Sequence, residues 1–287
     1  MKILVTGGAG MLGHDLDVTL TQAGHEVTLA PRTALDITSL PACAAAVDGH
    51  DVVVNAAAWT KVDDAETHEA AAFDVNATGA ANLSLASRRA GARLVQVSTD
   101  YVFAGDATSP YAEDAPLAPR SAYGRTKAAG EWAVRSICPD SYLVRTAWLY
   151  GAHGPNFVKT MARLAGERDT VSVVDDQRGQ PTWTHDLASA ITVLIGSDAP
   201  FGIYHGTSTG EATWFDLARG VFEVLGLDPA RVLPTTTAAF PLPAPRPAYS
   251  VLGHDAWGAV DGGLLPDWRE SLGRSVPLVT QSAGSTV

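Results

Sequence analysis

The chain has 287 residues, of which 46% are hydrophobic and 18% are charged, so it can bury a sizeable core. Its 31 acidic and 20 basic side chains give a net charge of −11, which argues against nucleic acid and anionic membrane surfaces as partners. Two cysteines, and no apolar stretch of the roughly 20 residues that a membrane span needs, predict a soluble cytoplasmic protein without a disulfide framework.

Short apolar runs alternate with helix-like segments through the first half of the chain. The expected strands and helices are 3–5 (strand), 11–23 (helix), 26–30 (strand), 51–55 (strand), 70–90 (helix), 93–98 (strand), 122–137 (helix) and 141–148 (strand). Strand, helix and strand at this spacing are typical of βαβ units with right-handed crossovers. The pattern predicts an α/β fold with a doubly wound, parallel Rossmann-type sheet.

After Gly151 the strands and helices no longer alternate regularly, and the segments are shorter. The expected elements are a helix at 156–166, a strand at 171–174, a loop at 175–183, a helix at 185–195 capped by Thr184, and a strand at 201–206. Five prolines between residues 234 and 247 predict an irregular or extended connection.

We therefore divide the chain into two domains and a tail. Residues 1–152 are expected to form a domain that binds NAD(P). Residues 153–280 are expected to form a smaller, mainly substrate-binding domain, some of whose elements could return to the first domain. The small polar residues 281–287 are expected to be a disordered tail.

A glycine-rich turn joins the first expected strand to the first expected helix. Gly7, Gly10 and Gly13 have the spacing GxxGxxG. The first glycine allows a tight turn, the second lets a pyrophosphate approach the backbone, and the third allows the helix to pack closely on the strand. A plain tight turn is the alternative, but the strand before and the helix after it favour a dinucleotide site.

The end of the second expected strand bears on the choice of cofactor. No carboxylate stands there to bind the ribose 2′-hydroxyl of NADH, whereas Arg32 could hold the 2′-phosphate of NADPH by a charge-assisted contact. A solvated surface arginine is the alternative. We expect NADPH, with NADH tolerated. Asp36 and Ile37 follow where a loop could meet the adenine, although Asp36 could equally belong to a turn or a helix cap.

Tyr123 and Lys127 lie four residues apart at the start of an expected helix, so both side chains share one face. A nearby ammonium would lower the pKa of the phenol towards the operating pH, as general acid–base chemistry requires. The spacing alone is common by chance. Thr99 lies near the carboxyl end of an expected strand and could hydrogen-bond a substrate oxygen; a strand-terminal cap is the alternative.

Several motifs between residues 3 and 252 resemble those of the extended short-chain dehydrogenase/reductases, and within them the dTDP-4-dehydrorhamnose reductases. The motifs that carry this resemblance include NAAAWTKVDDAE at 55–66, STDYVF at 98–103, YGRTK at 123–127, RTAWLYG at 145–151, DDQRGQPT at 175–182 and RPAYSVL at 246–252.

The resemblance implies that Thr99, Tyr123 and Lys127 are catalytic. Tyr123 would protonate the oxygen of a C4 ketone, Lys127 would bind the nicotinamide ribose, and Thr99 would orient the carbonyl. With the glycine turn and Arg32, the expected cofactor-binding residues are Gly7, Gly10, Met11, Leu12, Gly13, Arg32, Asp36, Ile37, Ala58, Trp59, Thr60, Val97, Tyr123 and Lys127.

The same resemblance implies that Thr99, Asp100 and Trp148 contact a sugar nucleotide. From chemistry alone we add Arg246 as a clamp for the pyrophosphate, against the alternative of an exposed loop arginine. No metal is expected, because Asp15 and His185 stand where some relatives have magnesium-binding glutamates.

The implied reaction is the NAD(P)H-dependent reduction of the C4 ketone of dTDP-4-dehydro-L-rhamnose to dTDP-L-rhamnose. A 4-ketoreductase of another dTDP-deoxysugar, such as one of a dihydrostreptose or antibiotic-sugar pathway, would carry the same motifs. A 4,6-dehydratase is disfavoured, because Tyr101 and Val102 stand where its carboxylate would be. A non-catalytic NADP-binding regulatory subunit is disfavoured by the intact catalytic set. The expected partner is a small nucleotide sugar, and a homodimer is left open.

Overall fold

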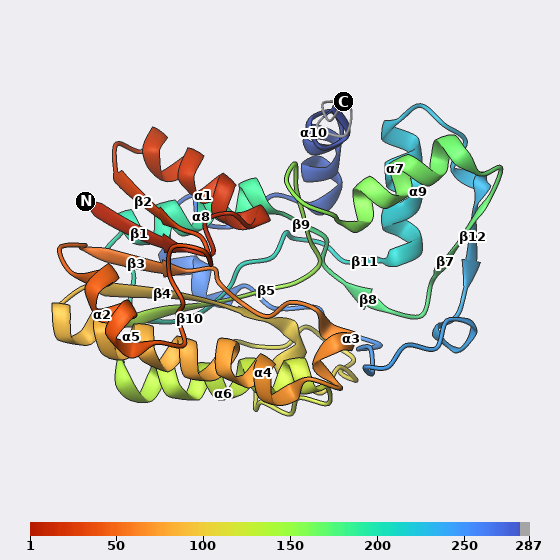
Figure 1. Ribbon diagram of the computed structural model, residues 1–287. Helices are drawn as coiled ribbons and strands as arrows, with labels where there is room; N and C mark the ends of the chain where they lie inside the picture. Colours follow the sequence, from red (N-terminus) through yellow and green to blue (C-terminus); the bar gives the residue numbers. More distant parts are fainter. Residues whose placement is uncertain (282–287) are drawn as a thin grey trace.

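A central sheet of six parallel strands forms the larger part of the computed structural model, which describes residues 1–281 (Figure 1). The strands follow the order β10-β5-β4-β3-β1-β2, and every neighbouring pair is parallel. Their bounds are β1 (Lys2–Thr6), β2 (Glu26–Ala30), β3 (Val52–Asn55), β4 (Arg93–Thr99), β5 (Ser141–Thr146) and β10 (Gly202–His205). The predicted α/β fold with a doubly wound parallel sheet is confirmed.

Helices cover both faces of this sheet, which explains why every residue of the inner strand β3 is buried. On one face, α1 (Met11–Gln22) and α8 (Thr184–Gly196) pack against the strands around Leu16 and Ile191. On the other face the covering helices are α2 (Leu40–Val47), α5 (Gly79–Ala90) and α6 (Ala122–Ile137). Two of these elements come from the second half of the chain: β10 is the edge strand beside β5, and α8 covers one face of the sheet.

The helix expected at 70–90 is divided by a π-helical turn. It begins as α4 (Glu69–Phe73), passes through the π turn Asp74–Thr78 and continues as α5. Within the turn, Asn76 Oδ1 accepts the Trp59 N–H at 2.8 Å, and its Nδ2 donates to the Trp59 carbonyl at 3.2 Å. The predicted long helix is therefore found, with an irregular turn inside it that carries the amide holding the segment around Trp59.

Two boundaries near the middle of the chain differ from the prediction. The strand expected at 141–148 ends at Thr146, because Trp148 adopts a left-handed φ of 47°. Thr184 is not the cap of α8: Trp183 occupies the N-cap position, and the Thr184 hydroxyl donates to the Tyr150 carbonyl at 3.2 Å. The expected cap is therefore the first residue of the helix instead.

A smaller lobe lies beside the sheet and has its own apolar core (Figure 1). It contains α7 (Phe157–Glu167), α9 (Trp214–Val224), α10 (Trp268–Gln281) and the parallel pair β7 (Val171–Val174) and β12 (Val232–Thr235). The helices α9 and α10 have no counterpart in the sequence-based prediction. The proline-rich stretch begins inside β12, where Pro234 lies opposite Val173 in a two-stranded sheet.

The remaining short elements connect the two lobes. They are α3 (Val62–Ala65), β6 (Leu149–Tyr150), β8 (Arg178–Gly179), β9 (Thr182–Trp183) and β11 (Ala212–Thr213). They form two further strand pairs: β6 is parallel to β9, and β8 is antiparallel to β11. These pairs place the segment 175–183 between the sheet and the smaller lobe.

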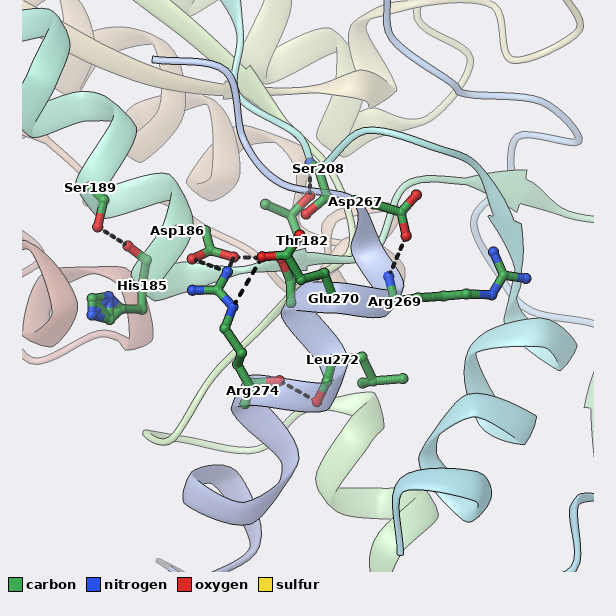
Figure 2. Close-up of polar contacts among 12 residues, drawn as sticks. Thr182, His185, Asp186, Ser189, Ser208, Asp267, Arg269, Glu270, Leu272 and Arg274 are labelled. Atoms are coloured by element: carbon green, nitrogen blue, oxygen red, sulfur yellow. Dashed lines mark hydrogen bonds and ion pairs between the residues drawn. The ribbon is translucent and has the colours of Figure 1, made fainter. Parts of the chain in front are cut away.

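The buried carboxylate of Asp186 ties the C-terminal helix to the start of α8, as Figure 2 shows. It accepts a hydrogen bond from Ser271 Oγ at 2.5 Å and two from Arg274 Nη2 at 2.8 and 2.9 Å. The Arg274 guanidinium also lies 5.3 Å from the centroid of the Trp183 ring. The disordered tail expected for 281–287 falls almost wholly on residues 282–287, which lie outside the described residues. No helix within 1–281 is long and apolar enough to cross a membrane.

Candidate active site

A cleft of about 1170 Å³ lies where the glycine turn, the ends of β4 and β5, and the smaller lobe meet. Every residue that the sequence analysis assigned to the cofactor, to the substrate or to catalysis lines this cleft. The volume suits a large ligand, and the position beyond the carboxyl ends of parallel strands is the usual one for this class of sheet.

The glycine turn leaves no room for side chains at two of its positions. Gly7 has a φ of +71°, and a Cβ on it would lie 2.8 Å from the backbone of Ala56. A Cβ on Gly13 would lie 2.5 Å from the Gly7 carbonyl oxygen. Gly10 is the N-cap of α1 and offers no side-chain oxygen to the first N–H groups of that helix. A cradle of this kind, with uncapped N–H donors, fits a diphosphate.

The expected adenine end of the cleft is open. Arg32 is exposed, lines the cleft and forms no ion pair among the described residues. Asp36 accepts the Thr38 hydroxyl at 2.7 Å and the Thr38 N–H at 3.0 Å, and these bonds lower the pKa of its carboxyl. Because Ser39 caps α2, Asp36 is a turn residue rather than the cap. Ile37 is buried.

Helix α6 carries Tyr123 and Lys127 into the cleft. Ser121 caps this helix by accepting the Gly124 N–H, so Tyr123 is its second residue and Lys127 follows one turn later. Lys127 Nζ donates to the Val97 carbonyl on β4 at 2.7 Å. Both side chains are almost fully buried, and the spacing of four brings them to the same cavity, as predicted.

Burial dominates the pKa values of these two groups. It raises the pKa of the Tyr123 phenol, while a hydrogen bond with Thr99 opposes the effect and the charge of Asp100 adds to it. The sequence analysis expects Lys127 to lower this pKa, whereas its direction in the structure is upward, with burial as the largest cause. Burial lowers the pKa of Lys127 to about 8, and the negative charge of Glu131 opposes that shift.

The ends of β4 and β5 supply a group of buried polar side chains. Thr99 Oγ1 donates to Asp100 Oδ1 at 2.9 Å, and burial raises the pKa of Asp100 to about 6. Asp100 Oδ2, Ser98 Oγ and Thr146 Oγ1 are buried without a hydrogen-bond partner among the described residues. Since buried polar groups are normally paired, these atoms point to a polar ligand.

Sequence reasoning missed Ser98 and Thr146. The available signal was that both lie near the carboxyl ends of expected strands; the structure then places Thr146 opposite Thr99 in the register of β4 and β5. Hydroxyls at matching strand ends meet at one edge of a sheet, where ligands bind.

Aromatic rings form the wall of the cleft on the side of the smaller lobe. Trp148 stacks on Trp214 with centroids 3.7 Å apart and planes 9° apart. Trp214 Nε1 donates to Gln177 Oε1 at 3.1 Å, which fixes the second ring. A Cβ on Gly179 would lie 2.6 Å from the Trp148 indole, so this glycine makes room for the stack. Trp214 and Gln177 were not predicted; Gln177 lies in the DDQRGQPT motif, whereas nothing in the sequence near Trp214 signalled its place.

Arg246 lines the cleft and is not an exposed loop arginine, since its side chain is only 15% exposed. Its Nη2 lies 2.6 Å from Asp63 Oδ2, and its Nη1 donates to the Ala244 carbonyl at 3.1 Å. The guanidinium is therefore held in a defined place at the edge of the cavity.

Comparison with known proteins identifies the family. Residues 1–280 match the family model described as the RmlD substrate binding domain. The chain belongs to this family. A dTDP-4-dehydrorhamnose reductase of Streptomyces griseus is 52% identical over 99% of this chain and 96% of its own length. A probable dTDP-4,6-dihydroxy-2-methyloxan-3-one 4-ketoreductase of Streptomyces antibioticus is 51% identical over 96% of this chain and 95% of its own length.

One solved structure is similar to this protein along nearly the whole length of both chains. The dTDP-4-dehydrorhamnose reductase of Bacillus anthracis, in complex with NADP, superposes with a TM-score of 0.91 at 39% identity, covering 96% of this chain and 98% of that one. The expected resemblance to the dTDP-4-dehydrorhamnose reductases, and with it the expectation of an enzyme of the reductase class, is confirmed.

Within residues 1–281 no group of three or more His, Cys, Asp or Glu side chains is placed to hold a metal ion. Asp15 Oδ2 and His185 Nδ1 are each buried without a hydrogen-bond partner among these residues. The ring of His14, the residue before Asp15, stacks on that of His153 with centroids 4.1 Å apart.

Proposed function

We propose that the chain reduces the C4 ketone of dTDP-4-dehydro-L-rhamnose to dTDP-L-rhamnose, with NADPH as the reductant. The observation that carries the proposal is the convergence of Thr99, Tyr123 and Lys127 with the glycine turn and Trp148 in a single cleft. A nucleotide cradle, a buried acid and a stacking wall for the second ligand are the parts that a sugar-nucleotide reductase requires.

The residues present fit a dinucleotide. The cradle of Gly7, Gly10 and Gly13 and the uncapped start of α1 would hold the diphosphate. Arg32 would meet the 2′-phosphate, and Ala58–Thr60 would line the path towards the nicotinamide. When bound, NADPH supplies the hydride that adds to C4 of the sugar.

Tyr123 donates the proton to the ketone oxygen in this proposal. Burial raises the pKa of its phenol, so the group is protonated at neutral pH and has a proton to give. Lys127, whose pKa is lowered to about 8, is still mainly charged at pH 7. Its Nζ is anchored to the Val97 carbonyl and would offer its other N–H groups to the nicotinamide ribose. Thr99 would orient the carbonyl towards Tyr123.

The sugar nucleotide would lie between the strand ends and the smaller lobe. Asp100 and the unpaired hydroxyls of Ser98 and Thr146 would hydrogen-bond the sugar. Trp148 offers an apolar face for a pyranose ring or base. Arg246 would contact the diphosphate, because it lies at the edge of the same cavity.

A 4-ketoreductase of another dTDP-deoxysugar is the second candidate. It is favoured by the Streptomyces antibioticus relative, whose identity of 51% is nearly that of the first relative. Both reactions use the same acid and the same hydride donor, so the choice depends on contacts with the sugar.

A panel of dTDP-4-keto-6-deoxysugars, each incubated with NADPH or NADH and followed by product identification, tests the proposal. We expect NADPH oxidation that depends on the sugar nucleotide, and dTDP-L-rhamnose as the main product. Preferred turnover of another sugar would support the second candidate. No oxidation with any sugar of the panel would contradict both and would favour a non-catalytic NADP-binding subunit.

A further inference from the structure

Asp63 joins two parts of the cleft that are far apart in the sequence. It lies in α3, three residues after Thr60, and Thr60 ends the segment Ala58–Thr60 that is expected to bind the cofactor. Its Oδ1 accepts the Ala244 N–H at 3.1 Å, and its Oδ2 accepts Arg246 Nη2 at 2.6 Å. Both carboxylate oxygens therefore bind one short segment of the chain more than 180 residues later.

This contact fixes the Arg246 guanidinium without using all its donors. The ion pair with Asp63 and the hydrogen bond to the Ala244 carbonyl occupy one terminal nitrogen each. An arginine has five N–H groups, so the side chain retains donors for a ligand while its position is already fixed. Because the side chain is already held in place, less conformational entropy is lost when a ligand binds to it.

Asp63 also serves as one of two anchors for the segment between residues 237 and 246. At the other end, Asp176 accepts both the N–H and the hydroxyl of Thr237. Between the anchors, Phe240 and Leu242 line the cleft although about half of each side chain is exposed. Without the anchor at Asp63, only the end at Thr237 would hold this wall of the cleft by a carboxylate.

Electrostatics favour the charged state of this anchor. The hydrogen bonds and the positive charge of Arg246, together with the Ala244 N–H, outweigh the effect of burial and lower the pKa of Asp63. The pair is also better shielded than the surface pairs of this chain, since Arg246 is 15% and Asp63 37% exposed. The carboxylate is therefore ionised at neutral pH and keeps its hold on Arg246.

We infer that Asp63 is a positioning residue for the sugar-nucleotide diphosphate, acting through Arg246 and the wall formed by residues 240–246. The inference rests on the proposed function, because it takes a nucleoside diphosphate as the ligand that Arg246 meets. Asp63 itself contacts neither the sugar nor the cofactor in this account. Its loss weakens diphosphate binding and leaves the proton transfer at Tyr123 unchanged.

The test compares Asp63→Asn with Asp64→Asn, a matched control on the same helix whose carboxylate forms an ion pair only with His68 among the described residues. Titration calorimetry with dTDP and with thymidine measures binding with and without the diphosphate. We expect Asp63→Asn to bind dTDP about tenfold more weakly. Its affinity for thymidine and for NADPH should stay at the wild-type value, as should all three affinities of Asp64→Asn.

A double-mutant cycle separates positioning from a general structural role. In an Arg246→Gln background, Asp63→Asn should cause a much smaller further loss of dTDP affinity, because only the contact with the Ala244 N–H is left to weaken. In turnover assays the KM for the sugar nucleotide should rise while kcat changes little. If Asp63→Asn proves unfolded by circular dichroism, Asp63→Glu keeps the charge and should bind dTDP more tightly than Arg246→Gln does.

Three results would overturn the inference: wild-type dTDP affinity in Asp63→Asn, an equal loss for thymidine and NADPH, or a full additional loss in the Arg246→Gln background. Failure of the wild-type protein to bind dTDP would overturn it as well. Failure to reduce any 4-keto sugar contradicts only the proposed function, since the dTDP titrations need no turnover.

Discussion

Lys127 donates from its Nζ to the carbonyl oxygen of Val97 at 2.7 Å, which ties the helix that carries Tyr123 to the strand that carries Thr99. The contact joins the two elements whose side chains, the acid and the hydroxyl that would orient the substrate, line one cavity. It also uses one of three N–H groups of the ammonium and leaves the others for a ligand.

Replacing Tyr123 by Phe should remove the proton donor and keep the ring. We expect kcat to fall by about 10²–10⁴-fold, while the affinity for NADPH remains unchanged. Steady-state turnover and a binding titration with NADPH measure the two effects. Tyr142→Phe is the control, because the Tyr142 hydroxyl bonds the Ala199 carbonyl away from the cleft. Wild-type turnover in Tyr123→Phe would show that another group is the acid.

The pH dependence of turnover should follow the protonation state of Lys127. Its pKa is lowered to about 8, so the side chain loses its proton as the pH rises through that value. The raised pKa of Tyr123 keeps the phenol protonated over the same range. We expect kcat/KM for NADPH to fall above pH 8 in the wild type, and the fall to move to higher pH in Lys127→Arg. Coincident profiles for the two proteins would contradict the assignment.

Arg32 should determine the preference for NADPH. Hydrogen bonds to a charged group contribute about 1.5–3 kcal/mol, so Arg32→Ala should weaken NADPH binding by about tenfold or more and leave NADH binding unchanged. Equilibrium titrations of both cofactors measure the difference. Arg135→Ala, an exposed arginine on α6, is the matched control. An equal loss for both cofactors would remove the argument for phosphate recognition.

A methyl group at Gly179 should disturb the stack of Trp148 on Trp214. The new Cβ would lie 2.6 Å from the Trp148 ring, and such overpacking costs about 1–3 kcal/mol. We expect Gly179→Ala to raise the KM for the sugar nucleotide without a change in NADPH affinity. Gly166→Ala in α7, where a Cβ meets nothing within 4 Å, should behave like the wild type. An unchanged KM in Gly179→Ala would show that the indole position is unimportant for the substrate.

Breaking the buried ion pair of Glu131 and Arg145 should lower the free energy of unfolding. Both side chains are 1% exposed, with Arg145 Nη2 2.8 Å from Glu131 Oε2. Glu131→Gln leaves the arginine charge unpaired in the interior, and we expect the free energy of unfolding to fall by about 3–5 kcal/mol. Urea denaturation measures it. Glu167→Gln breaks an exposed pair with Arg163 and should cost less than about 1 kcal/mol. Similar losses in the two variants would contradict the role of burial.

Much of the larger lobe could be predicted because its signals are local. The short apolar runs predicted all six strands of the central sheet near their observed positions, and the spacing of Gly7, Gly10 and Gly13 predicted the turn. The helices α9 and α10 were missed, although α9 begins with a capping box formed by Thr213 and Asp216. Their packing in the smaller lobe depends on partners throughout the second half of the chain.

The sequence by itself determined the order of the elements, the nucleotide cradle and the pairing of Tyr123 with Lys127, because each depends on residues within about one turn or one βα unit. Only the tertiary structure decided that Asp63 meets Arg246, that Trp148 stacks on Trp214, and that burial raises the pKa of Tyr123. These features arise where segments distant in the chain exclude water together, and no local pattern records which segments those will be.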